Sequence, residues 1–131
     1  MTNRRLLLFL ATIIALLTAC HLEEWSDARR FQEDFHHSYD FSPGGRLYVE
    51  NFNGPVEIAG WDRESVEVSG TKYASTEEAR DALKIDILPS AGLIRVRTVR
   101  PSGYHGNMGA RFLVKAPRRT VLERIQTSNG A

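Results

Sequence analysis

The side chains that could perform catalysis are few and scattered along this sequence. The closest set to a nucleophilic triad is Ser102, His105 and Asp62. No Gly-x-Ser-x-Gly turn surrounds Ser102, and a glycine-rich stretch such as the one that holds Ser102 and His105 positions side chains poorly. The acidic pairs Glu23-Glu24 and Glu77-Glu78 are explained by solvation or by a helix N-terminus. We therefore expect no active site, no enzymatic activity and no cofactor.

Metal binding is not expected either. The sequence contains four histidines, of which His36 and His37 are adjacent, so on a strand their side chains would point to opposite faces. Ligands that diverge in this way cannot share one ion, because a metal site needs two or three ligands that converge from rigid elements. The chain has one cysteine, which excludes an internal disulfide and any cysteine-based zinc or iron-sulfur centre.

Surface recognition is the kind of chemistry that the sequence leaves open. Trp61 and Tyr104 fall at a strand end and in a loop, where aromatic rings can bind carbohydrate or protein. Arg95 and Arg97 alternate along one strand and would share a face, which suits anionic glycans or lipid headgroups. Each feature has a structural alternative: Trp61 could cover the core beneath a turn, and the arginines could protect an edge strand with charge.

The overall charge excludes one class of partner. The chain of 131 residues carries 17 Lys and Arg against 16 Asp and Glu, a formal net charge of +1. A basic nucleic-acid-binding protein would show a large positive excess, so we expect no nucleic-acid partner. After removal of a leader, the length suits one small domain.

Residues 1–19 have the layout of a signal peptide. Arg4 and Arg5 precede an apolar run that is too short for a permanent membrane span. The run ends in Leu17-Thr18-Ala19-Cys20, which resembles the lipobox of bacterial lipoproteins. The resemblance implies cleavage between Ala19 and Cys20, acylation of Cys20 and anchoring in a membrane through the acyl chains. Residue 21 is His, whereas Asp there would resemble an inner-membrane retention signal, so in a two-membrane cell we expect the outer membrane.

The mature chain divides into two parts. Residues 20–42 are rich in charge, with aromatic residues that show no clean period of two, and we interpret them as a tether. From residue 43 to 131, short runs of alternating and β-branched residues are separated by turn signals, which predicts an all-β domain of short antiparallel strands. One short helix is predicted over 75–83, where Ser75 and Glu78 form a capping box.

Asn-Gly dipeptides mark two turns in this domain. Asn53-Gly54 predicts a type I′ hairpin between strands at 46–52 and 55–60. Residues 84–88 and 93–99 predict a second hairpin across Ala91-Gly92. Ile125, Asn129 and Gly130 match Val49, Asn53 and Gly54 at a constant spacing of 76 residues, a weak internal repeat. Because Asn129-Gly130 is a turn without a returning strand, we expect these residues to be the front part of a longer repetitive β protein.

Several segments together carry a family resemblance. They are Gly44 to Ile58, Trp61-Asp62, Val66 to Val68, Val114 to Pro117 and Thr127 to Gly130. In this order they resemble a family of bacterial envelope lipoproteins labelled as adhesins, whose domain of unknown function has β-strand repeats. The resemblance covers about residues 40–131 and implies the start of a β-solenoid, a β-helix-like body of stacked rungs. The family offers no catalytic residues to transfer.

These observations predict a lipid-anchored protein of the bacterial cell envelope. We expect it to act without catalysis, as a scaffold, an adhesin-like protein or a binding module, with an envelope protein or a glycan as its partner. Two alternatives remain: an envelope sensor or enzyme whose working residues lie beyond residue 131, and a carbohydrate-binding module that uses Trp61 and Tyr104.

Overall fold

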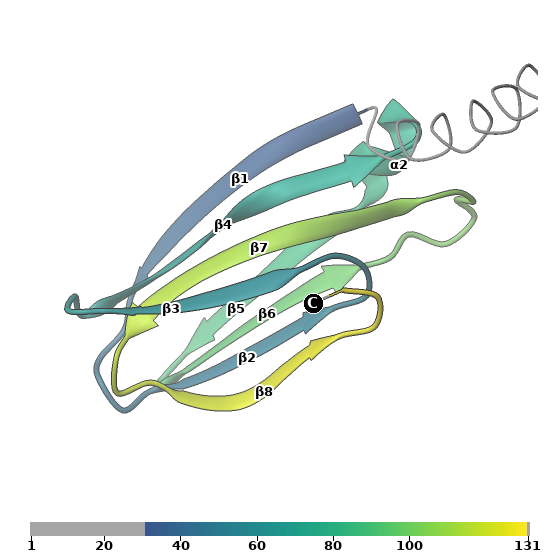
Figure 1. Ribbon diagram of the computed structural model, residues 1–131. Helices are drawn as coiled ribbons and strands as arrows, with labels where there is room; N and C mark the ends of the chain where they lie inside the picture. Colours follow the sequence, from purple (N-terminus) through teal and green to yellow (C-terminus); the bar gives the residue numbers. More distant parts are fainter. Residues whose placement is uncertain (1–30, 131) are drawn as a thin grey trace, which may run out of the picture.

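The computed structural model describes residues 31–130, which form two four-stranded sheets and one short helix (Figure 1). The first sheet has the order β1-β4-β7-β3 and the second the order β5-β6-β2-β8. The elements run β1 (Phe31–Asp40), β2 (Arg46–Asn51), β3 (Val56–Trp61), β4 (Ser65–Ala74), α2 (Glu77–Ala82), β5 (Lys84–Ser90), β6 (Leu93–Val99), β7 (Met108–Pro117) and β8 (Val121–Thr127).

The core lies between the two sheets. Strands of both sheets alternate between buried apolar and more exposed residues, as strands with one covered face do. Val49 and Ile94 from the second sheet and Phe112 from the first belong to one cluster of buried side chains. The prediction of a mostly β domain with one short helix is therefore confirmed.

The strand directions differ from the prediction. Pairs β1/β4, β4/β7 and β5/β6 are antiparallel, whereas β2/β6, β2/β8 and β3/β7 are parallel, so both sheets are mixed. The predicted hairpin across Ala91-Gly92 is confirmed as the antiparallel pair β5/β6. The expectation of antiparallel strands throughout is wrong, because three of the six pairs are parallel and only β5/β6 joins consecutive strands.

The segment 31–40, which the sequence analysis assigned to a tether, is strand β1. It pairs with the whole of β4, from Phe31 opposite Ala74 to Asp40 opposite Ser65. Phe31, Phe35 and Tyr39 are each four residues apart, which resembles helical spacing but also places all three on one face of a strand. Phe35 packs against Phe112 with ring centroids 5.4 Å apart. The β-domain thus begins at least twelve residues earlier than residue 43.

The Asn53-Gly54 turn does not form the predicted hairpin. Strands β2 and β3 belong to different sheets, so the turn is an arch that crosses from one sheet to the other. Gly54 has a φ of 118°, but no described residue other than glycine has a positive φ, which excludes the type I′ geometry. The Asn51 side chain holds this arch: it is fully buried and donates to the Gly54 carbonyl at 3.0 Å and to the Ala110 carbonyl at 2.7 Å.

The repeat with a spacing of 76 residues corresponds to two strands in register. Val49 of β2 lies beside Ile125 of β8, and the two strands run parallel. The turns that follow them also stack, because the Gly54 amide donates to the Asn129 carbonyl at 2.8 Å. The described strands form two open sheets, and no closed solenoid is seen among residues 31–130.

Two local predictions need correction. Helix α2 is capped by Thr76 rather than Ser75, since the Thr76 hydroxyl accepts from the Ala79 amide at 3.1 Å. Strand β5 continues through Pro89, where the sequence predicted a stop. Pro89 is tolerated because β5 is an edge strand and needs backbone donors on one side only.

Candidate functional site: the outer face of the second sheet

Three charged or aromatic side chains form a row across the outer face of the second sheet. Tyr48 of β2 lies beside Arg95 of β6 on one side and beside Arg124 of β8 on the other. The neighbours of Tyr48 along the strand, Leu47 and Val49, are fully buried in the core. Because successive side chains of a strand point to opposite faces, Tyr48 and the two arginines project from the outer face. We call these three residues the Arg-Tyr-Arg row.

Both guanidinium groups lie over the Tyr48 ring. The guanidinium carbon of Arg95 is 5.5 Å from the ring centroid and that of Arg124 is 5.8 Å from it. These distances fall within the range in which a cation is attracted to the face of an aromatic ring. The tyrosine therefore holds two positive charges near one another on a surface that faces outward.

The Tyr48 hydroxyl is fixed as a neutral donor. It donates to the Glu50 carboxylate at 2.6 Å, and this hydrogen bond is the main reason why the pKa of the Tyr48 phenol is raised above its usual value of 10.0. Arg124 is also oriented, because its guanidinium donates to the Gln126 side-chain oxygen. Tyr48 consequently adds no negative charge to the row at neutral pH.

The neighbouring arginines differ from the row in having acidic partners. Arg97 contacts Asp86 at 3.3 Å, and Arg46 contacts Glu123 at 3.6 Å. Among residues 31–130, no carboxylate forms an ion pair with Arg95 or Arg124. Of these four arginines, the two whose guanidinium groups form no ion pair are thus the two that lie over the aromatic ring.

The sequence placed Arg95 and Arg97 on one face, and the structure confirms this placement. They pair with Tyr48 and Glu50, which alternate along β2. The alternative that they protect an edge is wrong, because β6 lies inside the sheet between β5 and β2.

An irregularity in β8 brings Arg124 into the row. Leu122 pairs with Leu47, but Arg124 pairs with Tyr48, so Glu123 is an extra residue without a partner on β2. This is a β-bulge, which changes the face to which the following side chains point. Without the extra residue, Glu123 rather than Arg124 would lie beside Tyr48.

Trp61 has a structural role in this fold. It is the last residue of β3, and its indole nitrogen donates to the Ser65 carbonyl across the turn at 2.8 Å. Arg63 and Lys115 lie 4.9 and 5.8 Å from its ring centroid. The tryptophan therefore fastens the turn between β3 and β4, and two cations already lie against its ring. Trp61 is not among the side chains that pack against the main core cluster.

Tyr104 does not join Trp61 in one site. Tyr104 lies in the loop before β7, and Trp61 lies beside Pro117 at the far end of β7. A ten-residue strand separates the two ends, a length of about 30 Å. A carbohydrate site that uses both rings is thus excluded by the topology.

The residues considered for catalysis are also dispersed. Asp62 lies in the turn after β3 and accepts from Arg118 at 2.9 Å, whereas Ser102 and His105 lie in the loop at the opposite end of β7. In the described part of the chain, no three His, Cys, Asp or Glu side chains are grouped so that they could hold a metal ion.

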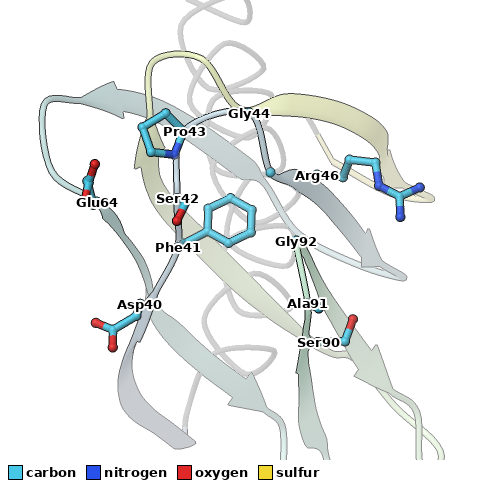
Figure 2. A pocket seen from close by; sticks show the side chains of 11 residues that line it. Asp40, Phe41, Ser42, Pro43, Gly44, Arg46, Glu64, Ser90, Ala91 and Gly92 are labelled. Carbon is cyan, nitrogen blue, oxygen red and sulfur yellow. The ribbon is translucent and has the colours of Figure 1, made fainter.

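An open groove of about 720 Å³ lies where β1 leads into β2, next to the turn between β5 and β6 (Figure 2). Phe41, which is 5% exposed, projects into the middle of it. The charged lining groups do not converge, because Arg46 points away from Asp40 and Glu64 in this view. The groove therefore lacks the converging polar groups that a specific small-molecule site needs.

Sequence reasoning missed Tyr48 and Arg124. The internal repeat contained a signal for this pair, because the spacing of 76 residues that aligns Val49 with Ile125 also aligns Tyr48 with Arg124. What the sequence could not show is that the repeated segments lie side by side and that β6 occupies the other side of β2.

Comparison with known proteins adds no relative. No family model matches the chain, and no curated protein or solved structure matches it.

The predicted cleavage and acylation site, Ala19 and Cys20, lies outside the described residues, as do residues 20–30 of the predicted tether. Over residues 31–130, no helix has the length and apolar character to cross a membrane.

Proposed function

We propose that this protein is a non-enzymatic binding module of the bacterial cell envelope, anchored by lipid at Cys20, which recognises anionic glycans with the Arg-Tyr-Arg row. The observation that carries the proposal is the pair of guanidinium groups over the Tyr48 ring, neither of which forms an ion pair with a described carboxylate. The row replaces the pair Trp61 and Tyr104 as the binding surface.

The chemistry of the row suits a polymer with carboxylate or phosphate groups. A guanidinium binds such groups through two parallel hydrogen bonds, and the aromatic ring offers a face for the apolar side of a sugar. The site lies on the exterior of a sheet, so it fits an extended chain rather than an enclosed small molecule. Attraction between ionised groups also raises the rate of encounter with a polyanion.

The lipobox resemblance supports the anchor, and the stacked Asn-Gly turns support membership of the adhesin family with β-strand repeats. In-register parallel pairing of β2 with β8 is the contact that successive rungs of a solenoid make. We propose on this basis that the β-domain is the start of a repetitive body. An acylated cysteine would hold it at the outer membrane of a two-membrane cell.

The binding proposal is tested by isothermal titration calorimetry with a hexuronate oligosaccharide as the probe. We expect Arg95→Gln and Arg124→Gln each to weaken binding by about tenfold or more, because each change removes a charge-assisted hydrogen bond. A neutral oligosaccharide of the same length should not bind.

The matched control is Arg119→Gln, which removes an exposed arginine from the turn before β8. It should leave the affinity unchanged. Equal losses in all three variants, or wild-type affinity in Arg95→Gln and Arg124→Gln, would overturn the proposal. Binding to anionic lipid vesicles but not to the hexuronate would replace the glycan with a lipid headgroup.

The anchor is tested by the intact mass of the protein from its membrane fraction. A mass that begins at an acylated Cys20 is expected, and an unmodified Cys20 would contradict the anchor.

A further inference from the structure

Leu88 of β5 is an exposed apolar side chain next to the Arg-Tyr-Arg row. It is 53% exposed, and its backbone lies opposite that of Arg95 in the antiparallel pair β5/β6. Ile87, the preceding residue, packs against the core, so Leu88 points to the outer face of the second sheet. Leu88 therefore lies on the side of Arg95 that faces away from Tyr48.

The other outward-facing residues of β5 are polar. By alternation along the strand they are Lys84, Asp86 and Ser90. Asp86 already forms an ion pair with Arg97. The one apolar residue at an outward position of this strand is thus the residue opposite Arg95.

Four side chains consequently follow one another across the sheet. In the order of the strands they are Leu88, Arg95, Tyr48 and Arg124, which are apolar, cationic, aromatic and cationic. Neighbouring strands lie about 4.8 Å apart, so Leu88 is about one strand spacing from Arg95. A glycan that lies across the strands with a carboxylate at Arg95 would bring a neighbouring substituent of its sugar against Leu88.

The substituent that suits Leu88 is small and apolar. One leucine between Asp86 and Ser90 offers apolar contact to a group about as large as a methyl, whereas a fatty acyl chain would need a continuous apolar patch. A free sugar hydroxyl gains nothing from this contact, because it would lose water without finding a hydrogen-bond partner. An acetyl group ends in a methyl and fits both conditions.

We propose that Leu88 extends the Arg-Tyr-Arg row and makes it selective for anionic glycans that carry acetyl groups. The Arg95 guanidinium binds the carboxylate, and Leu88 covers the methyl of an acetyl group on the same sugar or the next one. The inference rests on the glycan-binding function proposed above and names the class of glycan. Leu88 adds affinity only when the acetyl group is present.

The test compares two probes that differ in acetylation alone. They are an O-acetylated hexuronate oligosaccharide and the same oligosaccharide after mild alkaline removal of its acetyl groups, so chain length and carboxylates are identical. Isothermal titration calorimetry of the complete chain in detergent micelles should show about fourfold tighter binding of the acetylated probe, the effect of burying one methyl group. Leu88→Ser should abolish this preference and leave the affinity for the deacetylated probe unchanged.

Leu88→Met and Tyr104→Ser are the controls. Methionine retains an apolar side chain at residue 88, so Leu88→Met should keep most of the preference. Tyr104→Ser removes another exposed apolar side chain, 38% exposed, from the loop before β7. It should bind both probes like the wild type.

Several results would overturn the inference and leave the glycan-binding proposal intact. They are equal or weaker binding of the acetylated probe by the wild type, a preference that persists in Leu88→Ser, and a preference that is lost in either control. Leu88→Ser that binds both probes more weakly by the same factor would also overturn it, because Leu88 would then only support the arginine side chain. If the wild type binds neither probe, the glycan-binding function itself is contradicted, and the inference fails with it.

Discussion

Tyr48 combines two functions at the scale of the single residue. Its ring attracts Arg95 and Arg124, and its hydroxyl is occupied by Glu50. Neither Arg95 nor Arg124 forms an ion pair with Glu50. Replacement of either arginine by lysine would retain the charge but lose the two parallel hydrogen bonds that a guanidinium offers.

The raised pKa of Tyr48 gives a pH dependence with a defined sign. Because the pKa in the folded protein lies above the unfolded value of 10.0, folding favours the protonated phenol. The stability that Tyr48 contributes relative to Tyr48→Phe should be fully present below pH 10, and it should decline as the pH rises through the raised pKa. Chemical unfolding of both proteins over an alkaline pH series measures the difference; a difference that grows above pH 10 would contradict the assignment.

Asn51 is the only buried polar side chain of the described residues, and we expect it to be essential for the arch. Asn51→Ala removes the donor from the Gly54 and Ala110 carbonyls and the acceptor from the Thr98 hydroxyl, which lies 3.1 Å away. Unsatisfied groups of this kind should lower the free energy of unfolding by about 2–4 kcal/mol. Thermal or urea unfolding measures the loss.

The control for Asn51 is Asn53→Ala. The Asn53 amide also donates to a carbonyl, that of Met108 at 2.8 Å, but the residue is partly exposed and water can replace the bond. A similar loss of stability in both variants would contradict the role given to Asn51.

At the scale of elements, the arch and the stacked turns depend on Gly54. Its φ of 118° is a conformation that other residues rarely adopt, and a Cβ atom there would lie 2.1 Å from the Ala110 carbonyl oxygen. Gly54→Ala should cost about 1–3 kcal/mol for the backbone conformation alone, with a further cost from the clash. Unfolding by urea measures the loss.

Gly92→Ala is the matched control for the arch. Gly92 also has a positive φ, of 69°, but a Cβ atom there would meet nothing within 4 Å. It should be clearly less destabilising than Gly54→Ala. If the two variants lose the same stability, the close approach of the arch to β7 is not a determinant of the fold.

The sequence correctly predicted elements that depend on local signals. Its predictions were wrong where contacts with distant segments determine the structure. The hairpin β5/β6 was predicted because both strands flank a short glycine turn. The Asn53-Gly54 turn carries an equally clear local signal, but Asn51 is buried beside β7, a strand more than fifty residues away, and this contact turns a hairpin into an arch. Strand β1 was missed because its apolar spacing of four suits a strand and a helix equally.

At the scale of the whole molecule, the binding row depends on the order of the second sheet. The sequence identified Arg95 and Arg97 as residues that share a face, since alternation along one strand is a local property. Tyr48 and Arg124 could not be added without knowing that β2 lies between β6 and β8 and that β8 carries a bulge. Trp61 and Tyr104 looked equivalent in the sequence, but β7 separates them by its full length.

The most direct test of the account is a map of ligand contacts by nuclear magnetic resonance. Backbone amide shifts of the protein would be followed during titration with the hexuronate oligosaccharide. We predict that the shifted amides belong to the outer-facing residues of β2, β6 and β8 around Tyr48, with no change in the groove near Phe41 or at Trp61. Shifts confined to the groove or to Trp61, or no shift at all, would contradict the assignment of the Arg-Tyr-Arg row as the binding site.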